Sequence, residues 1–449
     1  MFDLQVKNGL IVNTNGVVAA SLYIKDGVVA AISNEEFDAR EVLDANGKLL
    51  VPGFVDSHSH MNDPPGGDVS EDFYTGTCSA AAGGITTSIE MPLTTPVTAT
   101  RKAFVDKRAI CGKKAIVDFA MYGACMPNNA DELEPMLEEG AIGFKSFTPY
   151  SIEIQRLDDA DMWNVMTRYA GTGITISIHC ENADMVKKFT EERVAMGQVT
   201  PEYYSAGRPE IAEYEAVARV CLFAYKTGAK VTIAHCSSPE AIDTAAYYRS
   251  LGADIAVETC THYLTLTEED TKKWGVYCIC NPPLRSQHTQ DLLWERVLAG
   301  KVDFIGTDHS AYLHHEKAEG KDNIFNTPAG ITALQTCYPV FFDEAVNKRG
   351  MDVTRFVEMT SAAAAKRYGL YPKKGVLAVG SDADFVLFDP AKKWVVDCDK
   401  LFYLEKWTPH EGQTITGCVE KTFVRGHEVY ADGKILAEAG SGQFVARLK

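Results

Sequence analysis

The sequence predicts an α/β protein: a (β/α)8 barrel of the TIM type with a small β-sandwich domain formed from both chain ends. Two observations support this fold class. Eight apolar, strand-like segments alternate with helical segments between residues 51 and 377, and eight parallel strands are the number that closes such a barrel. Short strand-like segments separated by Asn-Gly and Asp-Gly turns fill residues 1–50, and similar segments return in residues 378–449.

The elements of the barrel follow one another in regular order. The expected strands are 51–56, 85–91, 115–121, 141–147, 174–178, 230–235, 254–259 and 302–308. The clearest helical segments between them are 72–82, 157–170, 211–227 and 238–250. An open doubly wound sheet is the alternative, but no Gly-x-Gly-x-x-Gly opens a helix after any of these strands. Neither terminal segment has enough strands for a stable sheet, so 1–50 and 378–449 are expected to fold together beside 51–377.

Composition limits the classes of partner. The 449 residues are 46% apolar and 23% charged, which is typical of a soluble globular protein, and the formal net charge is −17. That charge argues against nucleic acid and anionic membranes, because both require a basic face. No apolar run is long enough to span a bilayer, and no signal peptide opens the chain. The twelve cysteines are sparse and several lie within expected strands, so we expect buried thiols and a cytoplasmic protein.

Two histidines spaced i, i+2 follow the first expected strand of the barrel. In an extended backbone alternate side chains point the same way, so His58 and His60 can face one point. Imidazole is the commonest side-chain metal ligand, and this arrangement suits Zn²⁺ or a similar ion. Taken alone, the pair is weak evidence for a metal, and two ordinary, partly buried histidines are the more common explanation.

Further polar residues fall in or at the ends of other expected strands. They are Lys145 in the fourth strand, His179 after the fifth, His235 at the end of the sixth and Asp308 at the end of the eighth. In such barrels the site is built at the carboxyl ends of the strands, so these side chains are expected to converge on one mouth. Four histidines and one aspartate exceed what one zinc ion with an open position needs. Two divalent ions therefore fit this set of ligands better, and Zn²⁺ is the expected metal.

Lys145 is unusual because a lysine within an apolar strand is costly unless it is used. If its amine captures CO₂, the resulting carbamate has two oxygens and could bridge two ions. The alternative is a lysine whose amine extends to the rim of the barrel.

The chain resembles the cyclic amidohydrolases of the amidohydrolase superfamily. The resemblance rests on five ordered motifs: Pro52-Gly-Phe-Val-Asp-Ser-His-Ser-His60, Gly143-Phe-Lys145, Ile178-His-Cys-Glu-Asn182, Ala234-His-Cys-Ser-Ser238 and Gly306-Thr-Asp-His-Ser310. It implies that His58, His60 and Asp308 hold one metal, that His179 and His235 hold the other, and that N6-carboxylated Lys145 bridges them. It further implies hydrolysis of a cyclic amide, with Asp308 taking the proton of the attacking water and passing it to the leaving nitrogen.

The subfamily is divided between two patterns. Met61-Asn-Asp-Pro64, Ala81-Ala-Gly-Gly-Ile-Thr-Thr87, Met91-Pro-Leu93 and Phe119-Ala-Met-Tyr-Gly123 look most like allantoinases, although the usual arginine after Pro64 and cysteine after Lys145 are Pro65 and Ser146 here. Tyr150 and Asn281-Pro-Pro-Leu-Arg285 look more like dihydropyrimidinases and hydantoinases, in which that tyrosine hydrogen-bonds the developing oxyanion. Dihydroorotase is disfavoured, because Asn62 and Leu93 stand where its substrate-binding arginine and asparagine would be.

The expectations for substrate and partners follow from this resemblance. Allantoin is the expected substrate, with hydantoins or dihydropyrimidines as the alternative, and Asn62, Tyr150 and Asn281 are the expected substrate contacts. A homotetramer is expected. A scaffolding protein that has lost its metal ligands is the rival of another class, but all six ligand positions are filled here. His262 is expected to be a hydrogen-bonded structural residue, His309 to point away from the metals, and His314 to Lys317 to be solvated.

Overall fold

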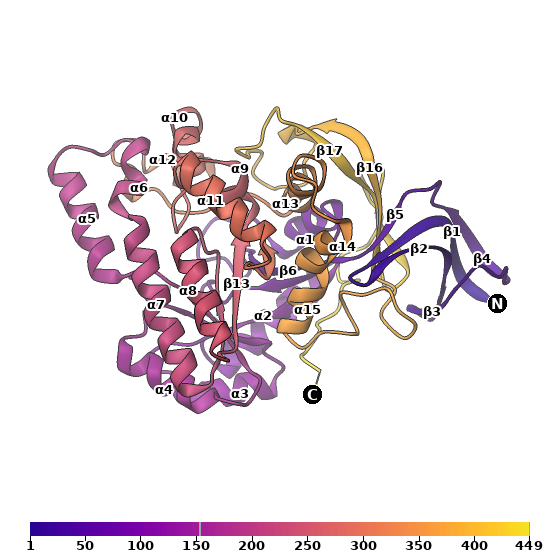
Figure 1. Ribbon diagram of the computed structural model, residues 1–449, viewed down its shortest axis with the longest axis horizontal. Coiled ribbons are helices and arrows are strands. Elements are labelled where there is room, and N and C mark those ends of the chain that lie inside the picture. Colours follow the sequence, from indigo (N-terminus) through magenta and orange to yellow (C-terminus); the bar gives the residue numbers. More distant parts are fainter. Residues whose placement is uncertain (152–153, 449) are drawn as a thin grey trace.

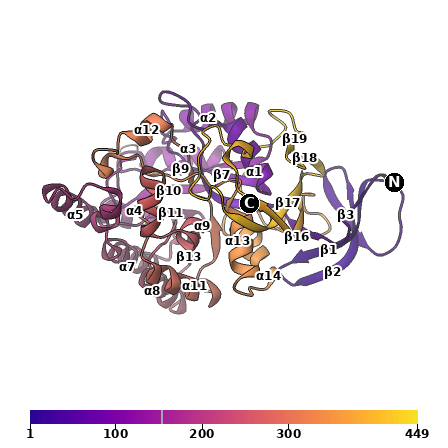
Figure 2. The ribbon, with the colours of Figure 1, turned by 90° about the horizontal axis from the view of Figure 1, so that it is seen from above.

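The computed structural model describes residues 1–151 and 154–448, and it contains three β-sheets flanked by helices (Figure 1). Two of the sheets are parallel and lie within the helical part of the molecule. The third sheet lies at the opposite end, where the indigo and yellow segments of the two chain ends meet (Figures 1 and 2). Within the described residues, no helix combines the length and the apolar character that a membrane crossing needs.

The third sheet has nine strands, and both chain ends contribute to it. Its strands are β1 (Phe2–Asn13), β2 (Gly16–Lys25), β3 (Val28–Ser33), β4 (Ala39–Asp44), β5 (Leu49–Pro52), β16 (Phe385–Val395), β17 (Thr414–Val424), β18 (His427–Ala431) and β19 (Lys434–Ile435). The two ends meet where β5 pairs antiparallel with β16. Apolar side chains from early and late strands, such as Leu22 and Phe385, share one buried cluster. The chain therefore leaves this sheet after β5 and returns to it at β16.

The two parallel sheets contain the expected strands from residue 85 onward and the second half of the first expected strand. One sheet has the order β15-β6-β7-β8 and the other has the order β14-β13-β12-β11-β10-β9. Their bounds are β6 (Phe54–His60), β7 (Ile85–Glu90), β8 (Asp118–Met121), β9 (Gly123–Ala124), β10 (Gly143–Phe147), β11 (Thr175–His179), β12 (Lys230–Ile233), β13 (Ile255–Cys260), β14 (Phe304–Gly306) and β15 (His309–Ser310). The chain passes from one sheet to the other twice, from β8 to β9 and from β14 to β15.

The expected strand 51–56 is wrong as a single element. The chain divides at Gly53 into β5, which belongs to the nine-stranded sheet, and β6, which belongs to a parallel sheet. Gly53 donates its N–H to the Asp384 carbonyl, and a Cβ at this position would lie 2.0 Å from Thr86 Oγ1. Only glycine allows this close approach, so the break between the two sheets is fixed at this residue.

The four helices expected from periodicity are confirmed as α1 (Phe73–Ala82), α4 (Asp159–Tyr169), α7 (Glu210–Thr227) and α8 (Pro239–Ser250). Asp72, Asp158 and Ser238 cap the first, second and fourth of these, each accepting a hydrogen bond from a backbone N–H of the first turn. The other α-helices are α2 (Arg101–Lys114), α3 (Leu133–Glu138), α5 (Ala183–Ala195), α6 (Tyr204–Gly207), α9 (Thr261–Thr265), α10 (Thr271–Trp274), α11 (Gln287–Leu298), α12 (His314–Ala318), α13 (Cys337–Phe342), α14 (Val353–Val357) and α15 (Ala363–Arg367).

One buried ionic cluster joins the nine-stranded sheet to a parallel sheet. Lys374 is 1% exposed, and its Nζ lies 2.7 Å from Asp384 Oδ2 and 2.8 Å from Asp382 Oδ2. The same ammonium group also bonds Asp118 on β8, and Arg425 pairs with that aspartate from beyond β17. The three carboxylates are close enough to suggest a metal site, but Lys374 pairs with all three and Arg425 pairs with Asp118, so we regard the cluster as structural.

Candidate metal centre

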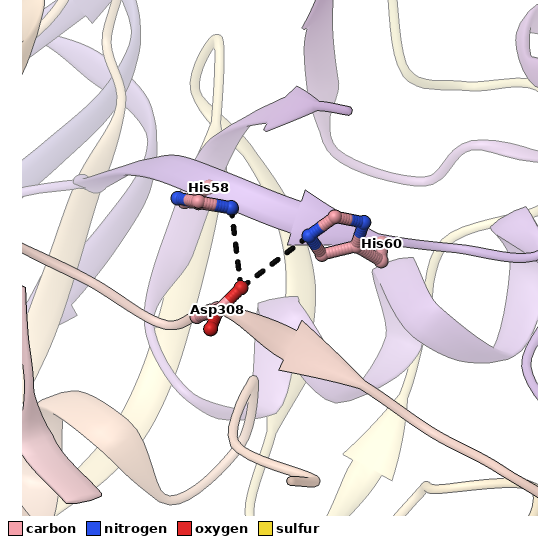
Figure 3. Close-up of side chains that lie close together, drawn as sticks. All are labelled: His58, His60 and Asp308. Carbon is pink, nitrogen blue, oxygen red and sulfur yellow. Dashed lines mark ion pairs between the residues drawn. The ribbon is translucent and has the colours of Figure 1, made fainter. Parts of the chain in front are cut away.

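His58, His60 and Asp308 lie together where β6 meets the segment after β14. Asp308 Oδ1 is 3.1 Å from His58 Nε2 and 3.3 Å from His60 Nε2 (Figure 3). The two histidines can share this partner because they alternate along β6, and Asp308 reaches them from a left-handed backbone conformation with φ of +46°. Burial opposes ionisation of Asp308, but the two imidazoles outweigh it and hold its pKa at about 2. The carboxylate is therefore ionised and faces both rings.

His179 and His235 form the second pair. Their ring centroids are 4.5 Å apart, and the His58 ring lies 5.2 Å from that of His235. Burial holds the pKa of His58 and of His235 well below the ordinary value, so both imidazoles are neutral, which is the form that binds metal ions. Residues from β6, β11 and the end of β12 are thus brought together, as their positions in the sequence predicted.

Lys145 on β10 lies among these histidines. Its side chain is fully buried, and the charge on its amine lowers the pKa of His58, His179 and His235. Burial lowers the pKa of Lys145 itself to about 8, against the opposing effect of Glu258 and Asp308. The amine is therefore inside the site and not at a rim.

The residues of this centre fit metal ions. Within the described part of the chain, Lys145 Nζ and His235 Nδ1 are buried without a hydrogen-bond partner. An unpaired buried polar atom is costly, and one near four imidazoles and a carboxylate is best explained as a ligand position. The donor set of nitrogen and oxygen atoms matches divalent ions such as Zn²⁺.

Glu258 is a member of the site that the sequence analysis missed. It is fully buried on β13, accepts hydrogen bonds from Ser57 Oγ and from the His235 N–H, and lies 2.7 Å from His58 Nδ1. A carboxylate on the second nitrogen of a ligand histidine fixes the ring and its tautomer. The signal was present, because Glu258 interrupts an apolar strand in the way that Lys145 does.

His179 has an equivalent supporting partner. Its Nε2 lies 2.6 Å from Glu181 Oε2, and Arg208 holds Glu181 through two hydrogen bonds. Burial opposes ionisation of Glu181, but Arg208 and His179 hold its pKa at about 2. Arg208 was not identified from the sequence, because nothing in its spacing relates it to Glu181.

The three expected substrate contacts lie in different surroundings. Tyr150 is 58% exposed and packs beside the Arg156 guanidinium in a surface hollow with Pro127 and Asp161, and none of the six expected ligands is among the described residues that line it. Asn281 accepts a hydrogen bond from the Tyr204 hydroxyl at 2.8 Å. Asn62 is half-buried directly after His60 and Met61. Residues 152 and 153, close to Tyr150, lie outside the described residues.

The expectation of a solvated segment from His314 to Lys317 holds for the exposed His314 and His315 but is wrong for Lys317, and the expectation for His262 is also wrong. Lys317 is fully buried, and its Nζ donates hydrogen bonds of 2.7 Å to the Pro328 and Gly330 carbonyls. His262 is 2% exposed, but within the described residues neither of its ring nitrogens has a hydrogen-bond partner. His309 accepts from the Ala333 N–H through Nδ1 and lies near Glu71, which agrees with its expected direction away from the ligands.

Known proteins resemble the chain over its full length. Residues 49–429 match the model of the amidohydrolase family. An L-hydantoinase of Paenarthrobacter aurescens is 36% identical, covering 100% of this chain and 98% of its own length, and an allantoinase of Escherichia coli O1:K1 is also 36% identical, covering 99% of each. The solved structure of an L-hydantoinase (dihydropyrimidinase) from Arthrobacter aurescens superposes with a TM-score of 0.96 at 35% identity, covering 100% of both chains. That of a dihydropyrimidinase from Brevibacillus agri NCHU1002 gives 0.94 at 30% identity, covering 100% of this chain and 99% of its own. The chain belongs to the amidohydrolase family.

Proposed function

We propose that this protein opens the ring of allantoin by metal-dependent hydrolysis of a cyclic amide. The observation that carries the proposal is the convergence of four histidines, Lys145 and Asp308 on one buried centre. The family match and relatives named allantoinase and hydantoinase support a hydrolase acting on a cyclic amide.

The proposed architecture is one closed (β/α)8 barrel of residues 51–377 with a β-sandwich domain of residues 1–50 and 378–449. It is supported by the two junctions, β8 to β9 and β14 to β15, at which the chain continues from one parallel sheet into the other. The pairing of β15 with β6 brings the last strand segment beside the first, as a closed barrel requires. Strand β5 crosses the proposed boundary, since it ends at Pro52.

Two divalent ions are proposed to occupy the centre, and Zn²⁺ is the proposed metal for both. His58, His60 and Asp308 would hold one ion and His179 and His235 the other, with a CO₂-derived carbamate on Lys145 as the bridge. The unpaired, buried Nζ of Lys145 supports this bridge, because the carbamate would give that position two oxygen ligands. When bound, the ions would lower the pKa of the attacking water and polarise the ring carbonyl.

Asp308 is the proposed proton carrier. Its Oδ1 faces His58 and His60, while Oδ2 points away from both rings (Figure 3). A carboxylate in this position can accept the proton of the attacking water and deliver it to the ring nitrogen, which is otherwise a poor leaving group. Asn62 and Asn281 are proposed substrate contacts. Tyr150 is proposed to stabilise the oxyanion, for which its side chain must turn from Arg156 toward the metal centre.

The second candidate substrate class is hydantoins and dihydropyrimidines. Tyr150 and the segment Asn281 to Arg285 favour it, as do the relatives named hydantoinase and dihydropyrimidinase. Arg285 is 5% exposed, and its Nη2 lies 2.9 Å from Glu213 Oε2, so that segment is fixed by a buried ion pair. Asn62 and Leu93, which follow the allantoinase pattern, favour allantoin.

The test is a hydrolysis panel of allantoin, hydantoin, 5-substituted hydantoins, dihydrouracil and dihydroorotate, with kcat/KM measured for each. We expect the highest value for allantoin. A kcat/KM for dihydrouracil or a 5-substituted hydantoin about tenfold above that for allantoin would reject the assignment, since it corresponds to about 1.4 kcal/mol of preferred transition-state binding. No turnover of any member would reject the cyclic-amide class itself.

A cytoplasmic homotetramer is proposed as the assembly. Exposed apolar side chains on neighbouring helices, Leu222 on α7 and Tyr247 on α8 among them, support contact with further copies. Light scattering coupled to size-exclusion chromatography tests this directly, and a monomeric mass would contradict it.

A further inference from the structure

Strand β13 and the helix that follows it carry further side chains of the types that bind metal ions. Glu258 and Cys260 are two residues apart on this strand and therefore point to the same side, and Glu258 contacts His58. His262 follows in α9, the short helix that continues β13. Neither Cys260 nor His262 belongs to the six ligands described above.

These side chains meet Asp308. One ligating atom each of Cys260, His262 and Asp308 lies within 4.8 Å of the other two. Cys260 is fully buried and His262 is 2% exposed, and within the described residues both nitrogens of His262 lack a hydrogen-bond partner. An imidazole buried with both nitrogens unpaired is costly, so this arrangement points to a ligand that the ring can bind.

We propose that Cys260, His262 and Asp308 form a third metal site, which takes a thiophilic divalent cation such as Zn²⁺ in excess or Cd²⁺. Thiolate, imidazole and carboxylate are the donor types of tetrahedral zinc sites, and three of them leave one position for water. Mg²⁺ and Ca²⁺ are excluded as occupants, because they require oxygen ligands throughout. Asp308 can serve both sites, since Oδ1 faces His58 and His60 and Oδ2 is turned away from them (Figure 3).

Binding at this site exchanges a proton for a metal bond. The S–H bond of Cys260 breaks, its proton passes to the buffer, and the sulfur keeps the electron pair that forms the metal–sulfur bond. Occupancy would also engage the Asp308 carboxylate, which the first metal site shares. If Asp308 carries the proton in hydrolysis, as proposed above, the third ion inhibits the enzyme. The binding itself does not depend on that role.

The experiment titrates the purified holoenzyme with Cd²⁺ and records two signals, the ultraviolet thiolate-to-cadmium charge-transfer band and the hydrolysis rate. The variants are Cys260→Ser and His262→Gln. The matched control is Cys280→Ser, because Cys280 is equally buried and lies near Cys260 but outside the group of three. Metal analysis after the titration checks that the resident ions stay bound.

We expect the wild type and Cys280→Ser to develop the band and to lose activity over the same Cd²⁺ range. Cys260→Ser should show no band, and half-inhibition of Cys260→Ser and His262→Gln should require about tenfold more Cd²⁺, equivalent to about 1.4 kcal/mol of lost binding. A band that persists in Cys260→Ser, or the absence of a band in the wild type, overturns the site. A charge-transfer band without inhibition would support the metal site and contradict only the proposed role of Asp308 as proton carrier. Because the band is recorded without substrate, the test of the site does not depend on the proposed reaction.

Discussion

The Asp308 carboxylate is the residue on which the proposed chemistry most depends. Its Oδ1 contacts His58 and His60, and its pKa of about 2 keeps it ionised near neutral pH. A group that must accept a proton during the reaction starts from the correct state.

Asp308→Asn is expected to lower kcat by about 10²- to 10⁴-fold, the usual contribution of general acid–base catalysis. The amide oxygen of asparagine can still coordinate, but the side chain cannot carry the proton. The measurement is kcat together with metal content on the same samples. Loss of metal in proportion to activity would make Asp308 only a ligand, and a decrease below about fivefold with full metal would remove it from the mechanism.

Among single residues, the sequence could predict the positions of those that lie in an expected strand or directly after one. His58, His60, His179, His235, Lys145 and Asp308 were all identifiable because the carboxyl ends of parallel strands meet. Glu258 was equally identifiable by its place in an apolar strand. His262 and Arg208 were not, because whether a side chain outside a strand finds a partner depends on tertiary contacts that spacing does not encode.

The loop that follows β15 begins close in sequence to Asp308, and Lys317 binds two of its backbone carbonyls. Residues 311–330 leave the site, form the short helix α12 and return, and the Ser310 N–H donates to the Ile331 carbonyl where the loop closes. Lys317 Nζ binds the carbonyls of Pro328 and Gly330 from inside the loop. The sequence suggested a solvated segment, because its composition is polar and gives no sign that the loop folds around its own lysine.

Lys317→Met is expected to lower the free energy of unfolding by about 2 to 3 kcal/mol, because it leaves buried carbonyls without their hydrogen-bond donor. Hydrogen exchange should quicken within residues 311–330 more than elsewhere. The matched control is Lys321→Met, at an exposed position of the same loop. Equal effects of the two substitutions would show that the buried contacts do not hold the loop.

The connection between the two ends of the molecule rests on Lys374. This residue bonds Asp118 on β8 and two aspartates that directly precede β16, Asp382 and Asp384, so it ties the returning chain to the parallel strands. The sequence predicted that the chain ends fold together, but it could not predict this cluster, because Asp118 lies 256 residues before Lys374.

Lys374→Ala is expected to lower the free energy of unfolding by about 3 to 5 kcal/mol, since it leaves buried carboxylates without their cation. Lys373→Ala is the matched control, because the neighbouring Lys373 is 47% exposed and reaches Asp382 only at 4.0 Å. Denaturant unfolding of both variants provides the comparison. A loss under about 1 kcal/mol for Lys374→Ala, no greater than that of an exposed pair, would contradict the structural role of the cluster.

Metal content per chain, measured in the wild type and in Lys145→Ala, tests the central claim most directly. The proposal of a binuclear centre bridged at Lys145 predicts two ions per chain in the wild type. In Lys145→Ala it predicts loss of bound metal and of hydrolysis, and Lys145→Met, which preserves most of the side-chain volume, should behave in the same way. A Lys145→Ala protein that keeps two ions and near-normal hydrolysis would contradict the bridging role of Lys145.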